Sequence, residues 1–289
     1  MLVGPVVAAV VAMIVRGRRK AALTVGLVTV GLLTALLALA SPGQGLFSDN
    51  VMSILGREIT LTPFVRSLFL FIYPALGALF AVCWVRPSGW AVAPLSLAAL
   101  SPLAGSLMIT PAGLGVAPLL AATALVIPVL HSGRFAAARS AWRFFLLVAV
   151  AGALLLIVAA PPVATGSAGW IVPLLAGLIL FGGFPFQSWV RGVARNAPES
   201  ALILVTGIVQ IVVVVFVLQL LDSAPAVRAT PEFRRTIRWS IAFSVLIAAF
   251  LLARAADWNQ VVAAALLFDM GFLPAAMLAP GADGMLLAL

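Results

Sequence analysis

The chain has few of the side chains that carry out chemistry in soluble enzymes. Only 9% of its 289 residues are charged, and it contains one lysine (Lys20), one histidine (His131) and one cysteine (Cys83). One cysteine excludes an intrachain disulfide and a cysteine-based metal site, and one histidine excludes a histidine pair at metal-binding spacing. A glycine-rich phosphate-binding loop is also missing. The sequence therefore predicts no metal site, no organic cofactor and no redox or hydrolytic site of its own.

Apolar side chains fill most of the sequence instead. They make up 64% of the residues, and the mean hydropathy is +1.23, whereas soluble domains are about one quarter charged and less than half apolar. We therefore expect an integral membrane protein that contacts the lipid bilayer. The net charge of +9 would suggest nucleic-acid binding in a soluble domain. Here the arginines are predicted in short loops between apolar segments, so no nucleic-acid partner is expected.

Apolar runs separated by Gly, Pro and polar residues occupy the chain almost from end to end. A helix needs about 20 apolar residues to cross a bilayer. The predicted fold class is an all-α polytopic membrane protein with about ten transmembrane helices. The predicted spans are residues 2–15, 21–40, 63–85, 90–109, 113–130, 144–163, 168–190, 199–221, 239–253 and 261–279.

The basic residues predict an orientation, because cytoplasmic loops are rich in Lys and Arg. With the N-terminus outside, the inner loops hold eleven Lys and Arg and the outer loops five. The first apolar segment precedes its basic cluster, Arg16–Lys20, which is the reverse of a signal peptide. We therefore expect a multi-pass protein of the cytoplasmic (inner) membrane. One outer cluster, VRATPEFRRTIR (227–238), opposes this orientation. All seven Trp lie near predicted span ends, where interfacial anchors are found.

One stretch, FPFQSWVRGVARNAPESALIL (184–204), resembles the signature of the antiporter-like subunits of complex I and of Mrp-type cation/proton antiporters. In that family F-P-x-H-x-W-x-P-D-A leads into A-P-T-P-x-S-A-L-x-H. The matching residues are Phe184, Pro185, Trp189, Ala197, Pro198, Ser200, Ala201 and Leu202. Gln187 replaces the first histidine of the pattern, Arg191-Gly192 replace its Pro-Asp, and Leu204 replaces the second histidine.

Two further segments support the resemblance. DWNQVVAAALLFDMGFL (257–273) is similar to the family's D-x-K-R-x-x-A-Y-S-S-x-S-x-M-G-F, and LGREITLTPFVRSLFLFIYP (55–74) resembles the start of its third span, which makes Arg66 a fold-related residue. The resemblance covers the whole chain loosely. It implies a single transmembrane domain, 1–289, with N-terminal helices (1–110), a five-helix repeat containing a broken helix (111–221) and a partial second repeat (222–289).

This chain lacks the residues with which the family moves protons. The family uses a Glu on the fifth span and a Lys on the broken seventh span. Here the fifth span, APLLAATALVIPVL, has no acid, and alignment on Pro185 places Leu180 at the lysine position. We therefore expect a membrane subunit of a complex I-like or Mrp-like assembly, associated with proton or Na⁺ movement and acting as a scaffold beside other membrane subunits.

The remaining polar residues are the candidates for a proton pathway, because conduction through hydrocarbon requires titratable groups or water at intervals. They are Asp269, Gln187, Gln210, Gln219 and Glu199. Asp269 is the only acid near the middle of a predicted span, and it would serve either as a proton carrier or as a structural hydrogen-bond donor. The glutamines would hold a short water chain or join helices by hydrogen bonds.

The break in the seventh span is predicted from Gly182, Gly183 and Pro185, because proline removes a backbone donor and glycine permits the bend. Such breaks mark ion sites in transporters. The signature loop that follows contains Trp189, Arg191, Arg195 and Pro198. Asn196-Ala-Pro-Glu199 is typical of a capping box, so Glu199 is expected to begin the eighth helix rather than to move protons. Arg191 and Arg195 are the cations with which it could pair.

Two alternatives to a scaffold stay open. In one, the chain is an active translocating subunit that uses Asp269 as its proton carrier. In the other, it is the membrane partner of a large zinc-containing protein in inorganic-carbon uptake, a role that other antiporter-like chains have. The genes that neighbour this one would separate these assemblies.

Overall fold

A computed structural model describes residues 2–39, 51–54, 57–86, 88–131, 135–159 and 169–279. Contacts divide the chain into two compact units. The first comprises Met1–Ser132 and Pro198–Val209, and the second comprises Gly133–Ala197 and Gln210–Leu289. The boundaries predicted at residues 110 and 221 stay predictions.

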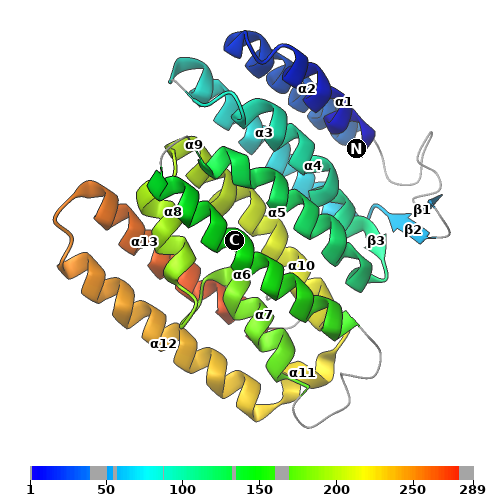
Figure 1. The fold of residues 1–289 in the computed structure, drawn as a ribbon. Helices are drawn as coiled ribbons and strands as arrows, with labels where there is room; N and C mark the ends of the chain where they lie inside the picture. The colour runs from blue at the N-terminus through cyan, green and yellow to red at the C-terminus, as the bar shows by residue number, and fades with distance from the viewer. Residues whose placement is uncertain are drawn as a thin grey trace. The chain divides into compact units, whose positions relative to one another are not determined.

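The first unit is built mainly from helices (Figure 1). Helix α1 packs on α2 and α4, α2 packs on α3, and α4 packs on α5. The bounds are α1 Val3–Ile14, α2 Arg19–Leu39, α3 Pro63–Val85, α4 Val92–Met108, a 3-10 turn Ala112–Gly115, α5 Val116–His131, α9 Glu199–Ile203 and a π-helical segment Leu204–Val209.

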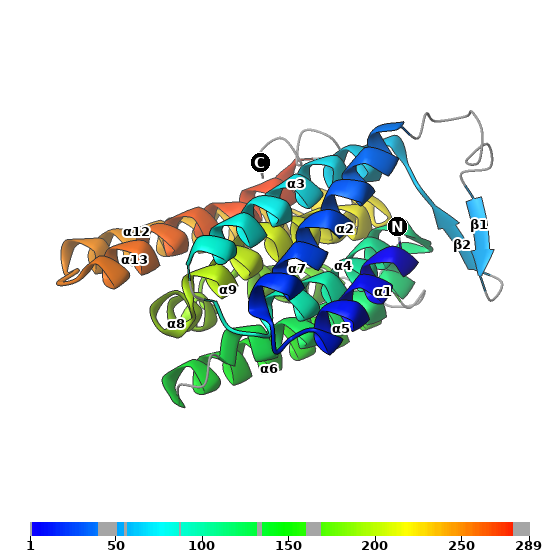
Figure 2. The same ribbon diagram turned by 90° about the horizontal axis from the view of Figure 1, so that it is seen from above.

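A small antiparallel sheet, which the sequence did not predict, belongs to this unit. Strand β1 (Val51–Ile54) pairs with β2 (Arg57–Thr60), and β2 pairs with β3 (Ile109–Thr110). Figure 2 shows β1 and β2 side by side. The strands occupy part of the segment predicted to be a loop and the end of the fourth predicted span.

Two arginines join α2 and α3. Each lies at the start of one of these helices and donates hydrogen bonds to carbonyl oxygens at the end of the other. Arg19, at the start of α2, donates to the carbonyl oxygens of Cys83 and Arg86 at the end of α3. Arg66, in the first turn of α3, donates through Nε to the carbonyl oxygen of Leu37 at 2.9 Å, near the end of α2. Guanidinium groups at helix C-termini satisfy free carbonyls and interact favourably with the dipole. Arg66 therefore stabilises the fold, as its motif predicted.

The second unit contains the remaining helices. Helix α6 packs on α7 and α8, and α13 packs on α8 and α12; α12 and α13 lie side by side in both views (Figures 1 and 2). The bounds are α6 Phe135–Ala159, α7 Ile171–Phe181, α8 Ser188–Asn196, α10 Gln210–Asp222, α11 Pro225–Ala229, α12 Pro231–Ala253, α13 Trp258–Phe272 and a 3-10 segment Leu273–Leu278.

Among the described residues, seven helical segments are long and apolar enough to cross a membrane. Three shorter apolar helices, α1, α4 and α7, fall below that length. The chain is therefore an all-α polytopic membrane protein, and the count of about ten spans stays a prediction. Helix α12 begins at Pro231, eight residues before the predicted span. Its basic segment continues the helix because arginine is a good helix former and Pro231 suits the first helical position.

Candidate functional site

The predicted break is present between α7 and α8. Helix α7 ends at Phe181, and Gly182 adopts the left-handed region with φ +61°. The Gly183 amide donates to the Leu178 carbonyl at 2.9 Å, and the Gly182 amide donates to the Ile179 carbonyl at 3.2 Å. This is a glycine-based helix C-cap, which satisfies carbonyls that the helix leaves free. A Cβ at Gly182 would lie 2.3 Å from Cγ2 of Val190, so only glycine fits here.

Neutral side chains also donate hydrogen bonds to the last carbonyls of α7. The indole nitrogen of Trp189 donates to the Ile179 carbonyl at 2.9 Å, and the amide nitrogen of Gln210 donates to the Leu180 carbonyl at 3.2 Å. Trp189 and Gln210 are both buried. Leu180 is the residue aligned with the family's lysine, and its side chain is also buried. An uncharged hydrogen bond to the backbone therefore lies at this position.

Two serines of α12 hold the middle of the break. The Phe184 amide donates to Oγ of Ser244 at 3.0 Å, and Oγ of Ser240 donates to the Phe184 carbonyl at 2.9 Å. The serines are four residues apart, so they lie on one face of the helix. The sequence interpretation missed them. The available signal was their spacing, SIAFS within an apolar span, because small polar residues often join membrane helices.

The other residues of the break are tightly packed or exposed. A Cβ at Gly183 would lie 3.1 to 3.3 Å from atoms of Leu178, Ser240 and Pro274. The Phe184–Pro185 bond is cis, and Pro185 is exposed. Gly183 therefore permits the close approach of the α7 end to α12.

Only one of the other two candidate glutamines lies at the break. Gln187 immediately precedes α8 and is buried, and its amide nitrogen has no hydrogen-bond partner among the described residues. Gln219 is half-buried on α10, nine residues after Gln210, and its side chain makes no hydrogen bond within the described part of the chain. The structure thus brings Gln187 and Gln210 to the break, without a hydrogen bond between them, and places Gln219 further along α10.

Asp269 lies in the middle of the Trp258–Leu278 segment, as predicted, but it is exposed rather than buried. Phe268 and Phe272, which form an edge-on ring pair with centroids 5.0 Å apart, are exposed on the same helix. Acids within membrane spans usually face the interior of the helix bundle. The exposed side of α13 instead carries the acid.

Glu199 begins α9, as predicted, but the capping box and the predicted ion-pair partners are wrong. The helix is preceded by Pro198 without a side-chain cap, and Oε2 of Glu199 contacts Nη1 of Arg86 at 2.8 Å. The Asn196 side chain instead donates to Oγ of Ser140 and to the Gly192 carbonyl, both at 2.9 Å. The capping box would have required Asn196 to precede a helix. In the structure Asn196 is instead the last residue of α8, and Glu199 is the first residue of α9.

The signature loop forms α8 and its end. Arg191 and Arg195 are exposed on α8, and no ion pair joins either to a described residue. Trp189 is fully buried and packs on Phe144, with ring centroids 5.1 Å apart. Trp189 therefore packs inside the protein, although it lies near the end of a predicted span, where interfacial anchors are found.

This arrangement can hold a broken helix without charge. Every side-chain hydrogen bond to the break between described residues comes from a tryptophan, a glutamine or a serine. The described residues also contain no group of three or more His, Cys, Asp or Glu that could bind a metal ion. The geometry satisfies backbone groups within a membrane helix, which hydrocarbon requires.

Comparison with known protein families and with curated proteins finds no match. Solved structures do match. A chain of the membrane-bound sulfane sulfur reductase, an archaeal respiratory membrane complex, has a TM-score of 0.79 at 13% identity, over 98% of this chain and 52% of that one. A chain of the Mrp complex from Dietzia sp. DQ12-45-1b has a TM-score of 0.76 at 16% identity, over 98% and 34%.

Respiratory complex I from Thermus thermophilus with bound Aureothin gives a TM-score of 0.71 at 16% identity, over 96% of this chain and 64% of the matching chain. This chain thus spans between 34% and 64% of the length of these three matched chains. At such low identities the likeness concerns the fold. The chain therefore has the fold of chains in complex I, in the Mrp complex and in the sulfane sulfur reductase complex, which is the fold that the sequence resemblance implied.

Proposed function

We propose that this chain is a structural membrane subunit of a complex I-like or Mrp-like assembly that moves protons or cations. In this role it holds neighbouring subunits in place and does not conduct ions through its own broken helix. The observation that carries the proposal is the neutral break. Trp189, Gln210 and the two α12 serines satisfy its backbone groups, and none of these side chains can exchange a charge with a neighbour.

The second family-like segment supports a structural role. Asp257 accepts a hydrogen bond from the Gln260 amide at 2.8 Å, so it caps the start of α13. A Cβ at Gly271 would lie 2.6 Å from Cβ of Ser244, so this glycine permits close packing of α13 on α12. Asp257 and Gly271 both match the family pattern quoted for this segment, and the contacts of both support the fold without any transfer of ions.

Asp269 supports the presence of a neighbouring subunit. A charged side chain facing lipid at the centre of a span costs about 2.5–3.5 kcal/mol on insertion scales. The exposed Asp269 carboxyl would lose this penalty if a helix of another subunit covered α13 and donated a hydrogen bond or a positive charge to it. We therefore infer that the exposed face of α13 contacts another membrane subunit.

The same residue favours the second candidate function, an active translocating subunit. Asp269 is the only acid within a described span and away from its ends. As a proton carrier at a subunit interface it would be essential, so Asp269→Asn would abolish ion flux. A structural Asp269 needs only its hydrogen-bonding oxygen, which asparagine keeps.

Purification of the tagged chain from its native membrane in gentle detergent, followed by mass spectrometry, tests the structural proposal. We expect other membrane subunits to be recovered with the wild type. Asp269→Leu should reduce their recovery severalfold, whereas Asp269→Asn should retain most of it. A chain recovered alone would contradict the proposal, and recovery with a large soluble zinc protein would favour inorganic-carbon uptake.

A further inference from the structure

A cluster of three arginines lies in the first two turns of α12. Arg234, Arg235 and Arg238 line an open groove of about 570 Å³ together with Pro231, Trp239 and Ala242. Residues 234 and 235 lie four and three positions before 238, so the three guanidinium groups can reach one face of the helix. The cluster is therefore a concentrated positive charge beside a tryptophan.

Neither helix stability nor membrane orientation accounts for this cluster. Positive side chains are favourable at the C-terminal end of a helix, where the dipole is negative, but these arginines follow the N-terminus of α12. They also belong to the segment that opposes the predicted orientation, since basic residues concentrate in cytoplasmic loops. Arg234 donates to a backbone carbonyl, but these two effects give Arg235 and Arg238 no role.

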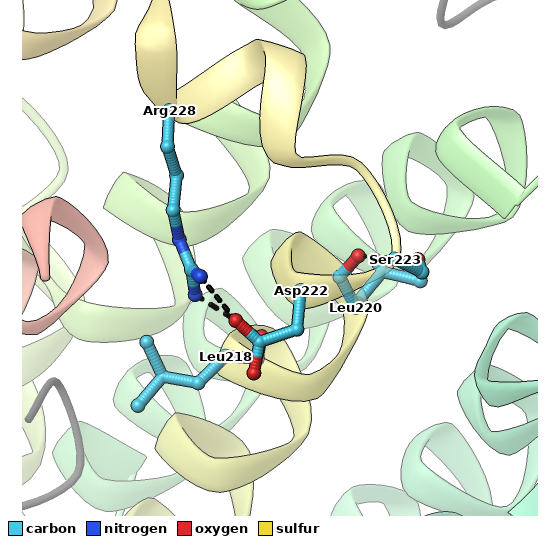
Figure 3. A network of polar contacts seen from close by, with 5 residues as sticks. All are labelled: Leu218, Leu220, Asp222, Ser223 and Arg228. Atoms are coloured by element: carbon cyan, nitrogen blue, oxygen red, sulfur yellow. Dashed lines mark hydrogen bonds and ion pairs between the residues drawn. The ribbon is translucent and has the colours of Figure 1, made fainter. Parts of the chain in front are cut away.

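The neighbouring Arg228 is already neutralised. Figure 3 shows that its guanidinium group points to the carboxylate of Asp222 at the end of α10. Arg228 also donates to the Leu218 carbonyl at 3.2 Å, and its own carbonyl accepts from Nε of Arg234 at 2.8 Å. These contacts fix the start of α12 next to the end of α10.

Two of the clustered arginines are available to a ligand. Within the described part of the chain, Arg235 and Arg238 have neither a hydrogen bond from the side chain nor an ion pair, and Glu232 pairs with neither of them. Guanidinium groups bind phosphate through two parallel N–H···O bonds. The chemistry of the groove therefore suits a phosphate group.

An apolar track continues from the groove along the same helix. Trp239, Ala242, Phe243, Leu246 and Phe250 are all exposed. Their spacing of three and four residues places them on one face. Only 22% of the apolar window of α12 is buried, the lowest share of the seven spans. A positive group followed by an apolar track matches the two parts of an anionic phospholipid, whereas a free phosphate or an acidic peptide would use only the first.

We propose that this surface is a binding site for an anionic phospholipid. Arg235 and Arg238 hold the headgroup phosphate, Trp239 lies at the level of the interface, and an acyl chain lies along Phe243 and Leu246. This site does not depend on whether the chain conducts ions. It would place the start of α12 at the bilayer surface, where clustered Lys and Arg bind acidic lipids.

Native mass spectrometry of the full chain with equimolar phosphatidylglycerol and phosphatidylcholine tests the proposal. We expect the wild type to retain phosphatidylglycerol in preference. Arg235→Gln/Arg238→Gln should lower that preference about tenfold, since each basic residue near the surface contributes measurably to binding acidic lipids. The matched control is Arg139→Gln/Arg143→Gln, which removes two exposed arginines of α6 and should leave the preference unchanged.

The lipid preference of the wild-type chain is a test that does not depend on whether a variant folds. An equal retention of both lipids by the wild type would overturn the proposal. An equal loss in the α6 control would mean that net charge, not this site, selects the lipid. Displacement of the lipid by millimolar inorganic phosphate would assign the site to free phosphate, and displacement by a co-purifying acidic protein would assign it to a subunit contact.

Discussion

The amide nitrogen of Gln210 lies 3.2 Å from the carbonyl oxygen of Leu180, across the contact between α10 and α7. In the antiporter-like pattern a lysine occupies the Leu180 position. Here the side chain at that position is apolar, and the neighbouring helix supplies a neutral donor to the backbone instead. The broken helix is thus held by hydrogen bonds from uncharged side chains.

Gln210→Leu should destabilise the protein by about 1 kcal/mol, because it removes the donor to a buried carbonyl. The measurement is the free energy of unfolding in detergent, obtained from denaturant titration. Gln219→Leu is the matched control, since Gln219 lies on the same helix and its side chain makes no hydrogen bond within the described residues. Equal losses in the two variants would contradict the assigned role of Gln210.

Gly182→Ala should be more damaging. The left-handed conformation costs an L-residue about 1–2 kcal/mol, and the new Cβ would lie 2.3 Å from Val190. We expect a lower unfolding temperature and a poorer yield of monodisperse protein. Gly31→Ala on α2 is the control, because its added Cβ would meet no atom within 4 Å apart from its chain neighbours and the adjacent backbone of its own helix. A Gly182→Ala variant as stable as wild type would show that the break does not need this cap.

Ser244→Ala and Ser240→Ala should each lower stability by about 1 kcal/mol, because each removes one partner of the Phe184 backbone. Thermal unfolding of both single variants and of the double variant measures the two effects and their coupling. Ser67→Ala is the control, since its exposed hydroxyl bonds only the carbonyl of Pro63 in its own helix. A loss confined to the control would refute the role of the serines.

Glu199→Gln should change stability by less than about 1 kcal/mol. The side chains of the Arg86–Glu199 pair are 70% and 80% exposed, and exposed ion pairs contribute little. A double-mutant cycle with Arg86→Gln measures the pair directly. A coupling energy well above that range would show that the pair is desolvated in the assembly, and would revive a functional role for Glu199.

The fold was predictable from hydropathy and motifs because both depend on local composition. The apolar runs contain the helices, and Gly182, Gly183 and Pro185 mark the break. The start of α12 was missed because hydropathy does not detect a helix that continues through arginines. The small sheet was missed because its strands are only two to four residues long.

The contacts at the site were less predictable because they join residues far apart in the chain. The Glu199 pair depends on Arg86, which lies 113 residues earlier. The hydrogen bonds to the backbone of Phe184 come from Ser240 and Ser244, which lie 56 and 60 residues later in the chain. The exposure of Asp269 depends on which face of α13 packs on α8 and α12, and a single polar residue in an apolar helix gives little information about that face.

Ion flux through proteoliposomes that contain the purified chain tests the central claim most directly. A pH-sensitive dye, and a Na⁺-sensitive dye in parallel, would follow flux under an imposed membrane potential for the wild type and for Asp269→Asn. The structural account predicts that both preparations match protein-free liposomes. Flux in the wild type that Asp269→Asn abolishes would contradict it and identify Asp269 as the carrier.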